Sequence, residues 1–150
     1  MQYRSQSLSN HKAEVDVLMH RFYSVDDKHA DLPDLDLDWD HYHALEAQDI
    51  LLLVTARDPE DKLVGMNLYI IGAHPHYKND KWAFCDTLAV DPDYRGQGIG
   101  KTLVKSSMLL LKERGVRYTA HGYRALYNTE PLFTRLGFMV MDHTYVKELV

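Results

Sequence analysis

The stretch Asp91 to Leu103, DPDYRGQGIGKTL, places three glycines within five residues and then continues as a helix-forming sequence. The first turn of a helix leaves backbone N–H groups without partners and carries partial positive charge, so it can hold an anion that approaches closely. Gly96, Gly98 and Gly100 remove the side chains that would block this approach. The stretch therefore predicts a strand, an anion-binding loop and a helix in direct succession.

Two common phosphate-binding motifs do not fit these residues. The P-loop needs a glycine five residues before its Gly-Lys pair, but that position is Arg95, and Gly96 lies one residue too close. A dinucleotide fingerprint needs Gly-x-Gly-x-x-Gly, and its third glycine would fall on Lys101. The loop also follows an expected antiparallel hairpin, whereas that fingerprint opens a βαβ unit. We therefore expect neither a nucleoside triphosphate nor a dinucleotide.

Length and composition limit the class of protein. A chain of 150 residues suits one core, so we expect a single domain over residues 1–150. The net charge of −5, with dispersed lysines and arginines, disfavours nucleic acid as a partner. No apolar run approaches the roughly 20 residues that span a bilayer, so we expect a cytoplasmic protein that does not use a membrane. The one cysteine, Cys85, is expected to be a buried structural thiol.

Hydrophobic periodicity predicts helices and strands along most of the chain. Asp38 is the expected N-cap of the second helix, and Gly115 is expected to end the third. Clustered strands followed by alternating helices and strands indicate an α/β (α+β) fold with a mixed sheet flanked by helices. The expected helices cover 9–23, 39–47, 99–113 and 129–136, and the expected strands cover 50–57, 63–72, 81–90, 116–120 and 138–147.

The pattern Arg95-x-x-Gly98-x-Gly100, preceded by a strand and Asp-Pro, resembles the loop of the GNAT superfamily of N-acetyltransferases. The segment LFTRLGF, 132–138, looks like the C-terminal helix-to-strand signature of that family, and the order of expected elements is similar throughout. The resemblance implies a mostly antiparallel central sheet of six to seven strands flanked by about four helices. It also implies acetyl-CoA as co-substrate, with its pyrophosphate in the loop, and no metal.

The expected coenzyme site combines the loop with the strand before it. Pyrophosphate oxygens can accept from amides at the helix start, while the guanidinium of Arg95 adds charge. In the family, the strand before the loop splays from its neighbour, and its free backbone groups pair with the pantetheine arm, which Asn128 could also bind. Carried over by position, the coenzyme-binding residues are Leu88, Ala89, Val90, Arg95, Gly96, Gln97, Gly98, Ile99, Gly100, Lys101, Asn128 and Phe133.

Acetyl transfer to an amine requires a base and a donor for the developing oxyanion. Asp86 is the only carboxylate in the expected strand 81–90, and period-2 alternation places it on the face of Leu88 and Val90. We therefore expect Asp86 to be the base, directly or through water. The alternatives are an anchor for the substrate amine and an ordinary edge carboxylate. By resemblance, the Leu88 N–H is the expected oxyanion donor.

The proton for the departing thiol needs another source, because the position of the tyrosine common in the family holds Phe133. Tyr127 is our first choice as the acid, with Tyr123 and His121 as alternatives nearby in the sequence. The other alternative is that the thiolate leaves without an acid. The resemblance implies direct transfer in a ternary complex, which requires no covalent intermediate on Cys85.

The expected acceptor is a primary amine on a small molecule or a protein. Aspartates concentrate in DDKHADLPDLDLDWD, 26–40, which is either a solvated loop or a mouth that attracts a protonated amine beside Trp39, Tyr42 and His43. The pairs His41/His43 and His74/His76 have no third metal ligand at a diagnostic spacing, so we interpret them as loop or acceptor-site residues.

Two matters stay open at this level. A catalytically weak module that binds coenzyme A to regulate or scaffold another protein is the alternative function, because the tyrosine is missing. Many relatives form homodimers, and the segment 138–150 could contribute to one, but no residue pattern decides this.

Overall fold

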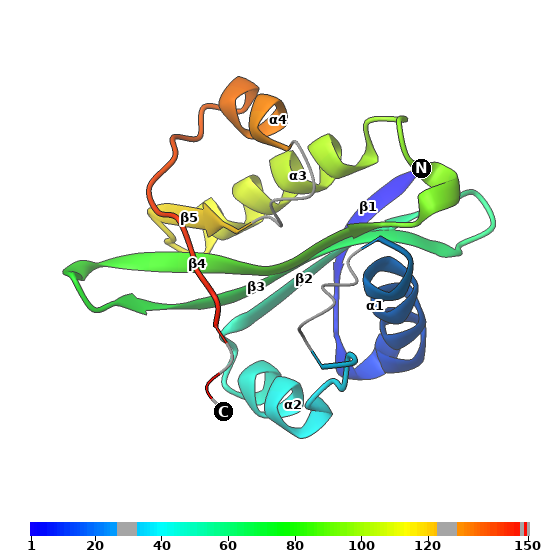
Figure 1. Ribbon diagram of the computed structural model, residues 1–150, viewed down its shortest axis with the longest axis horizontal. Coiled ribbons are helices and arrows are strands. Elements are labelled where there is room, and N and C mark those ends of the chain that lie inside the picture. The colour runs from blue at the N-terminus through cyan, green and yellow to red at the C-terminus, as the bar shows by residue number, and fades with distance from the viewer. Residues whose placement is uncertain (27–32, 123–128, 148, 150) are drawn as a thin grey trace.

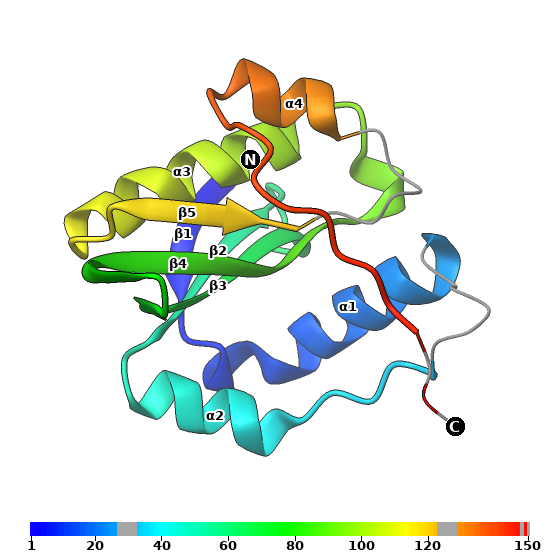
Figure 2. The ribbon, with the colours of Figure 1, turned by 60° about the vertical axis from the view of Figure 1, so that its left-hand side comes forward.

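A computed structural model describes residues 1–26, 33–122, 129–147 and 149 of the chain. It contains one mixed sheet with helices on both faces (Figure 1). Helices α1 and α2 cover one face, and α3 and α4 lie over the other (Figure 2). The mixed α/β architecture expected from the sequence is confirmed.

The strands follow one another in the sheet in the order β1-β2-β3-β4-β5. Neighbours are antiparallel from β1 to β4, and β4 pairs with β5 in parallel. The elements are β1 (Gln2–Gln6), η1 (Ser9–His11), α1 (Lys12–Asp26), α2 (Trp39–Ala47), β2 (Leu51–Arg57), β3 (Leu63–His74), β4 (Tyr77–Val90), η2 (Pro92–Tyr94), α3 (Ile99–Glu113), β5 (Tyr118–His121) and α4 (Glu130–Arg135).

The expected number of strands was too high, because the described residues form five strands and not six or seven. The segment 138–147, expected to be a final strand, forms none. It passes from the side of α3 and α4 to the side of α1 and α2 (Figures 1 and 2). The side chains of Met139, Val140 and Met141 are exposed, so the segment lacks the buried face that would fix it in a sheet.

Two stretches that look polar in the sequence belong to strands. β1 is an edge strand whose backbone pairs with β2, and an edge position tolerates polar side chains. β3 continues to His74 and β4 begins at Tyr77, so the expected break between 72 and 81 is a hairpin. Aromatic side chains of the two strands contact each other, with the rings of His74 on β3 and Trp82 on β4 4.6 Å apart. These contacts between strands are invisible to a pattern read along one strand.

Two apolar cores lie on opposite faces of the sheet. One joins β2 and β3 to α1 and α2, and the other joins the same strands to α3. All seven residues of β2 are buried because both of its faces are covered. Gly65 on β3 permits the close approach of α3, since a Cβ there would lie 3.1 Å from the side chains of Ile99 and Leu103.

The helix boundaries that depend on neighbouring residues are confirmed. The carboxylate of Asp38 accepts a hydrogen bond from the His41 amide at 2.9 Å and begins α2 as expected. α3 ends at Glu113, and Gly115 adopts a left-handed φ of 74° just after it. No described helix is both long and apolar enough to cross a membrane.

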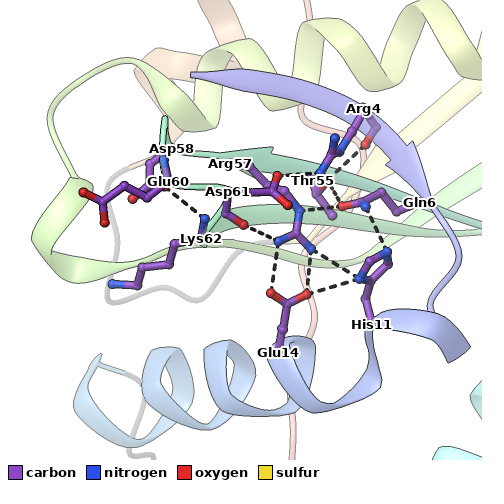
Figure 3. Close-up of polar contacts among 10 residues, drawn as sticks. All are labelled: Arg4, Gln6, His11, Glu14, Thr55, Arg57, Asp58, Glu60, Asp61 and Lys62. Atoms are coloured by element: carbon purple, nitrogen blue, oxygen red, sulfur yellow. Dashed lines mark hydrogen bonds and ion pairs between the residues drawn. The ribbon is translucent and has the colours of Figure 1, made fainter.

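Arg57, at the end of β2, is 2% exposed and joins β2 to α1, β1 and the β2–β3 turn (Figure 3). Its guanidinium makes a bidentate pair with Glu14 at 3.0 and 2.7 Å. It also donates to Gln6 at 2.8 Å and to the carbonyl of Asp61 at 2.6 Å. Hydrogen bonding from Arg57 lowers the pKa of Glu14. The stability from this pair is therefore present above the ordinary glutamate pKa and is lost as pH falls through the lowered value.

Replacing Arg57 by Met should lower the free energy of unfolding by about 2–3 kcal/mol, because Glu14 and Gln6 lose their shared partner. The loss stays below that of a fully buried pair because the Glu14 side chain is 43% exposed. The control Arg4→Met breaks the exposed pair with Asp61 and should cost less than about 1 kcal/mol. Urea unfolding at pH 7 measures both, and equal losses would contradict the role of Arg57.

Candidate functional site

The loop between β4 and α3 has the conformation expected from its glycines. Gly96 and Gly98 adopt left-handed φ values of 75° and 76°, and Gly98 occupies the N-cap position of α3. None of the described side chains caps this helix. The first bond of the helix runs from the Thr102 amide to the Gly98 carbonyl at 3.0 Å, so the amides of 99–101 precede it. The helix start therefore offers free donors and partial positive charge.

A pocket of about 330 Å³ lies at this helix start. Most of the loop residues predicted to bind the coenzyme line it, whereas Gln97 is exposed outside its lining. A hollow of about 580 Å³ between η1, α1 and Trp39 shares no lining residue with it. The pocket at the loop is lined by Val90, Tyr94, Arg95, Gly96, Gly98, Ile99, Gly100, Lys101 and Leu132.

Side chains from distant parts of the sequence hold this loop in place. The buried carboxylate of Asp91 accepts from the Asp93 amide and from Arg21 of α1, each at 3.0 Å. Arg21 also binds Asp93 at 2.8 Å. On the other side, the hydroxyl of Tyr94 donates to Asp58 in the β2–β3 turn at 2.8 Å. Sequence reasoning missed Arg21 and Asp58, because nothing near either residue signals a contact with the loop.

Arg95 contacts the strand and helix α1 in this structure. Its Nε donates to the carbonyl of Val90 at 3.3 Å, and its guanidinium lies 5.8 Å from the centre of the Phe22 ring. The guanidinium thus borders the pocket and adds positive charge beside the helix start. Its contact with an anion remains a prediction.

The pairing of β4 with β5 ends before the loop. The two strands pair only over Trp82–Cys85 and Tyr118–His121. Farther along, residues 87–90 pair with β3 on one edge, and no described strand pairs with them on the other. Leu88, Ala89 and Val90 lie in this part, and one backbone edge of it has no partner among the described strands. A splayed edge can pair with an extended ligand.

A β-bulge at Asp86 changes the predicted orientation of its side chain. Leu68 pairs with Thr87 and Tyr69 pairs with Cys85, so Asp86 is the extra residue between them. Its carboxylate bonds Tyr42 of α2, whereas Leu88 packs in the cluster against α3. The expectation that these two side chains share one face was wrong. The alternation in the sequence is interrupted at the bulge, which only the pairing with β3 reveals.

Hydroxyl groups surround the exposed carboxylate of Asp86. Its Oδ2 accepts from the Tyr42 hydroxyl at 2.8 Å and from the Thr87 hydroxyl at 3.2 Å. The Tyr23 hydroxyl lies 3.3 Å from that of Thr87. Burial, followed by the charge of Asp86, raises the pKa of Tyr42, so its hydroxyl stays protonated and donates. The sequence placed Tyr42 near the acceptor, but it did not indicate this bond to Asp86.

The expected acid Tyr127, its alternative Tyr123 and the proposed pantetheine contact Asn128 lie outside the described residues. The other candidate, His121, is the last residue of β5, and its Nε2 lies 2.7 Å from the Tyr69 hydroxyl. Phe133, on α4, is buried with its ring 4.9 Å from that of His121. Phe133, at the position of the tyrosine common in the family, thus lies next to the imidazole of His121.

The histidine pairs are found in two separate places. The rings of His74 and His76 lie 5.2 Å apart at the β3–β4 hairpin, whereas His43 contacts Trp39 on α2. Among the described residues, no group of three or more histidine, cysteine or acidic side chains could hold a metal ion. Of the acidic segment, 27–32 is outside the description, and 34–38 leads into α2.

The chain belongs to the acetyltransferase (GNAT) family, whose model matches residues 13–138. This confirms the family expected from the glycine loop and places the chain among the acyltransferases, in a family that uses acetyl-CoA. No curated protein sequence matches the chain.

Solved structures of acetyltransferases share the fold. A predicted acetyltransferase from Clostridium acetobutylicum, solved with acetyl-CoA, has a TM-score of 0.75 at 16% identity over 98% of this chain and 95% of its own. Glucosamine-6-phosphate N-acetyltransferase from Arabidopsis thaliana has a TM-score of 0.74 at 13% identity over 99% and 98%. An aminoglycoside acetyltransferase from an uncultured soil metagenomic sample, solved with trehalose, has a TM-score of 0.71 at 19% identity over 99% and 94%. At these identities the likeness concerns the fold.

Cys85 directly precedes the bulge at Asp86 but has the environment of a structural thiol. Its Sγ donates to Oδ1 of the buried Asn67 at 3.3 Å. Burial, followed by the nearby charge of Asp86, raises the pKa of Cys85, so little thiolate forms at neutral pH. Cys85 is half-buried and not fully buried as expected, and its contacts agree with a structural thiol.

Iodoacetamide at pH 7.5 should therefore modify the native protein slowly, at least about tenfold more slowly than the chain unfolded in urea, because only the thiolate reacts. Mass spectrometry measures both rates, and the single cysteine makes the assignment unambiguous. Native alkylation as fast as that of the unfolded chain would contradict the raised pKa of Cys85.

Proposed function

We propose that this chain acts as a single-domain N-acetyltransferase, which transfers the acetyl group of acetyl-CoA to a primary amine by direct attack in a ternary complex. The observation that carries the proposal is that the splayed edge of β4 leads directly into the uncapped start of α3. A coenzyme with a diphosphate and an extended amide-containing arm matches this succession of an anion site and a strand edge.

The residues of the pocket fit the coenzyme. Amides at the start of α3 and the charges of Arg95 and Lys101 would hold the diphosphate, and the pocket beside them has room for it. The open edge of 87–90 would pair with the pantetheine arm. When bound, acetyl-CoA supplies the thioester that the amine attacks. The Leu88 N–H remains our choice as the donor to the oxyanion.

Asp86 supplies the acid-base chemistry in this proposal. An amine that attacks must give up one proton, and an exposed carboxylate at the bulge can accept it directly or through water. The hydroxyls of Tyr42 and Thr87 fix the position of that carboxylate. In the transfer, a new N–C bond replaces the C–S bond, one proton leaves the amine nitrogen, and the sulfur departs with the bonding electron pair.

The acceptor would approach from the face of α1 and α2, because the Asp86 side chain points to Tyr42 on that face. Asp34, Asp36, Asp38 and Asp40 lie in or beside the start of α2 and add negative charge there. This charge favours an acceptor that arrives as a protonated amine and then loses a proton to react.

The alternative is a module that binds coenzyme A without turnover, for regulation or scaffolding. The observation that favours it is Phe133, which has no hydroxyl for the departing thiol and packs against His121. Release of free thiol from acetyl-CoA with a panel of amines separates the two functions. A binding module would show a thermal shift with coenzyme A but no amine-dependent thiol release.

Gly98→Ala tests the coenzyme site against the matched control Gly115→Ala. Both glycines have a φ near 75°, and a Cβ at either would meet nothing within 4 Å. We expect each change to cost about 1 kcal/mol of folding stability through backbone strain. Only Gly98→Ala should weaken coenzyme A binding, by about tenfold or more, in calorimetry. Absence of binding heat in the wild type, or equal affinities in both variants, would contradict the loop as the coenzyme site.

Asp86→Asn should lower kcat/KM by about 100-fold and flatten its rise with pH, because the amide cannot accept a proton. The matched control is Asp80→Asn, which changes another carboxylate of β4 that is paired with Arg117 and lies away from the bulge. The pH profile of kcat/KM should be unchanged in that control. A profile that persists in Asp86→Asn would contradict its role as the base.

A further inference from the structure

Between the sheet and α3, polar side chains form a connected chain of hydrogen bonds that the proposed function does not use. Nδ2 of Asn67 donates to the Tyr69 hydroxyl at 2.9 Å and to the Ser107 hydroxyl at 3.2 Å, and all three residues are fully buried. The Tyr69 hydroxyl in turn lies 2.7 Å from Nε2 of His121. Polar groups in an apolar core are costly unless paired, so a hydrogen-bonded series of this kind suggests a structural or functional role.

The direction of the bond between Tyr69 and His121 sets where His121 carries its proton, and the Nδ1 position is favoured if the Tyr69 hydroxyl donates to Nε2. The Tyr69 hydroxyl accepts from Asn67, which leaves its own proton free to go to Nε2 of His121. A neutral imidazole with an accepting Nε2 carries its proton on Nδ1. Burial lowers the pKa of His121 to about 4, so the ring is neutral at physiological pH.

Nδ1 of His121 is enclosed, yet it has no hydrogen-bond partner among the described residues. The ring lies between aromatic neighbours, 4.9 Å from Phe133, 5.3 Å from Phe138 and 5.2 Å from Tyr69 by centroids. An enclosed N–H without a hydrogen-bond acceptor is destabilising, and such unpaired groups in native proteins often mark functional positions. The missing hydrogen-bond acceptor for Nδ1 therefore requires an explanation.

The position of His121 indicates which group could accept this hydrogen bond. His121 ends β5 and pairs with Cys85, the last residue of β4 before the bulge. It thus lies where the pairing of β4 with β5 ends, beside the strand edge that the proposed function assigns to the pantetheine arm. It also contacts Phe133, where the family has its tyrosine hydroxyl.

We propose that the Nδ1–H of His121 donates a hydrogen bond to the sulfur of the acyl donor as it departs, and that Tyr69 is the positioning residue that keeps the proton on Nδ1. This inference rests on the proposed function. The imidazole keeps its proton, because losing it would leave an unstable imidazolate. The sulfur therefore departs as a stabilised thiolate and takes a proton from solvent afterwards, which explains how transfer proceeds with Phe133 in place of a tyrosine.

The tautomer of His121 can be measured without any activity assay, by NMR on protein labelled with ¹⁵N in its histidines. We expect His121 to carry its proton on Nδ1 from pH 6 to 8, in contrast to exposed histidines, and Tyr69→Phe to abolish this preference. Coenzyme A should shift the Nδ1 proton resonance, whereas desulfo-coenzyme A, which lacks only the sulfur, should not. A proton on Nε2, or equal shifts with both ligands, would overturn the proposal.

The pKa of the bound coenzyme A thiol, followed by thiolate absorbance, gives a second readout. His121→Leu should raise this pKa by about one unit, a tenfold loss of thiolate at fixed pH, because the donor is gone. His121→Asn keeps an N–H near the Nδ1 position and should restore part of the effect, which guards against a misfolded leucine variant. The control His20→Leu, on the exposed side of α1, should match the wild type. An unchanged thiol pKa in both His121 variants would overturn the proposal.

Calorimetry on the same samples separates this inference from the proposed function. If coenzyme A does not bind at all, the proposed function fails first. If coenzyme A binds and amines are acetylated but the His121 tautomer and the thiol pKa do not behave as expected, only the role of His121 is wrong.

Discussion

The parallel pairing of β4 with β5 ends at Cys85 and His121, and the rest of the site depends on this ending. A strand that loses its partner inside a sheet presents backbone donors and acceptors that an extended ligand can use. The bulge at Asp86 occurs at the same place and turns that carboxylate to the face of α1 and α2. One irregularity in the backbone thus turns Asp86 and Leu88 to opposite faces of the sheet, which the proposed function assigns to the acceptor and the coenzyme.

The proposed anion site at the start of α3 requires that the loop keep its position relative to that strand edge. Long-range contacts provide this rigidity. Asp91 is held by Arg21 of α1, and Tyr94 is held by Asp58 of the β2–β3 turn. The absence of a side chain at Gly65 lets α3 lie directly on the sheet. Loop, helix and strand therefore form one unit with both cores, which is the preorganisation that transfer chemistry requires.

Local features of this chain could be predicted well from the sequence, and features set between strands could not. The glycine loop, the Asp38 cap and the end of α3 depend on residues within one helical turn, and all were anticipated correctly. β1 was missed because an edge strand can be polar, and the tail 138–147 was overpredicted because its apolar residues remain exposed. These two errors cancel in the count, whereas the six to seven strands implied by the family resemblance exceed the five that the described residues form.

By itself, the sequence determined that a glycine loop would follow a strand and lead into a helix start whose glycine N-cap has no capping side chain, because glycine conformations and helix termini are local properties. Only the tertiary structure decided which way Asp86 points, since the bulge exists through the register with β3. It also decided the contacts of Tyr42 with Asp86, 44 residues apart, and of Tyr69 with His121, 52 residues apart. The physical reason is that side-chain direction and hydrogen-bond partners on a strand depend on its neighbours in the sheet and on the helices that cover it.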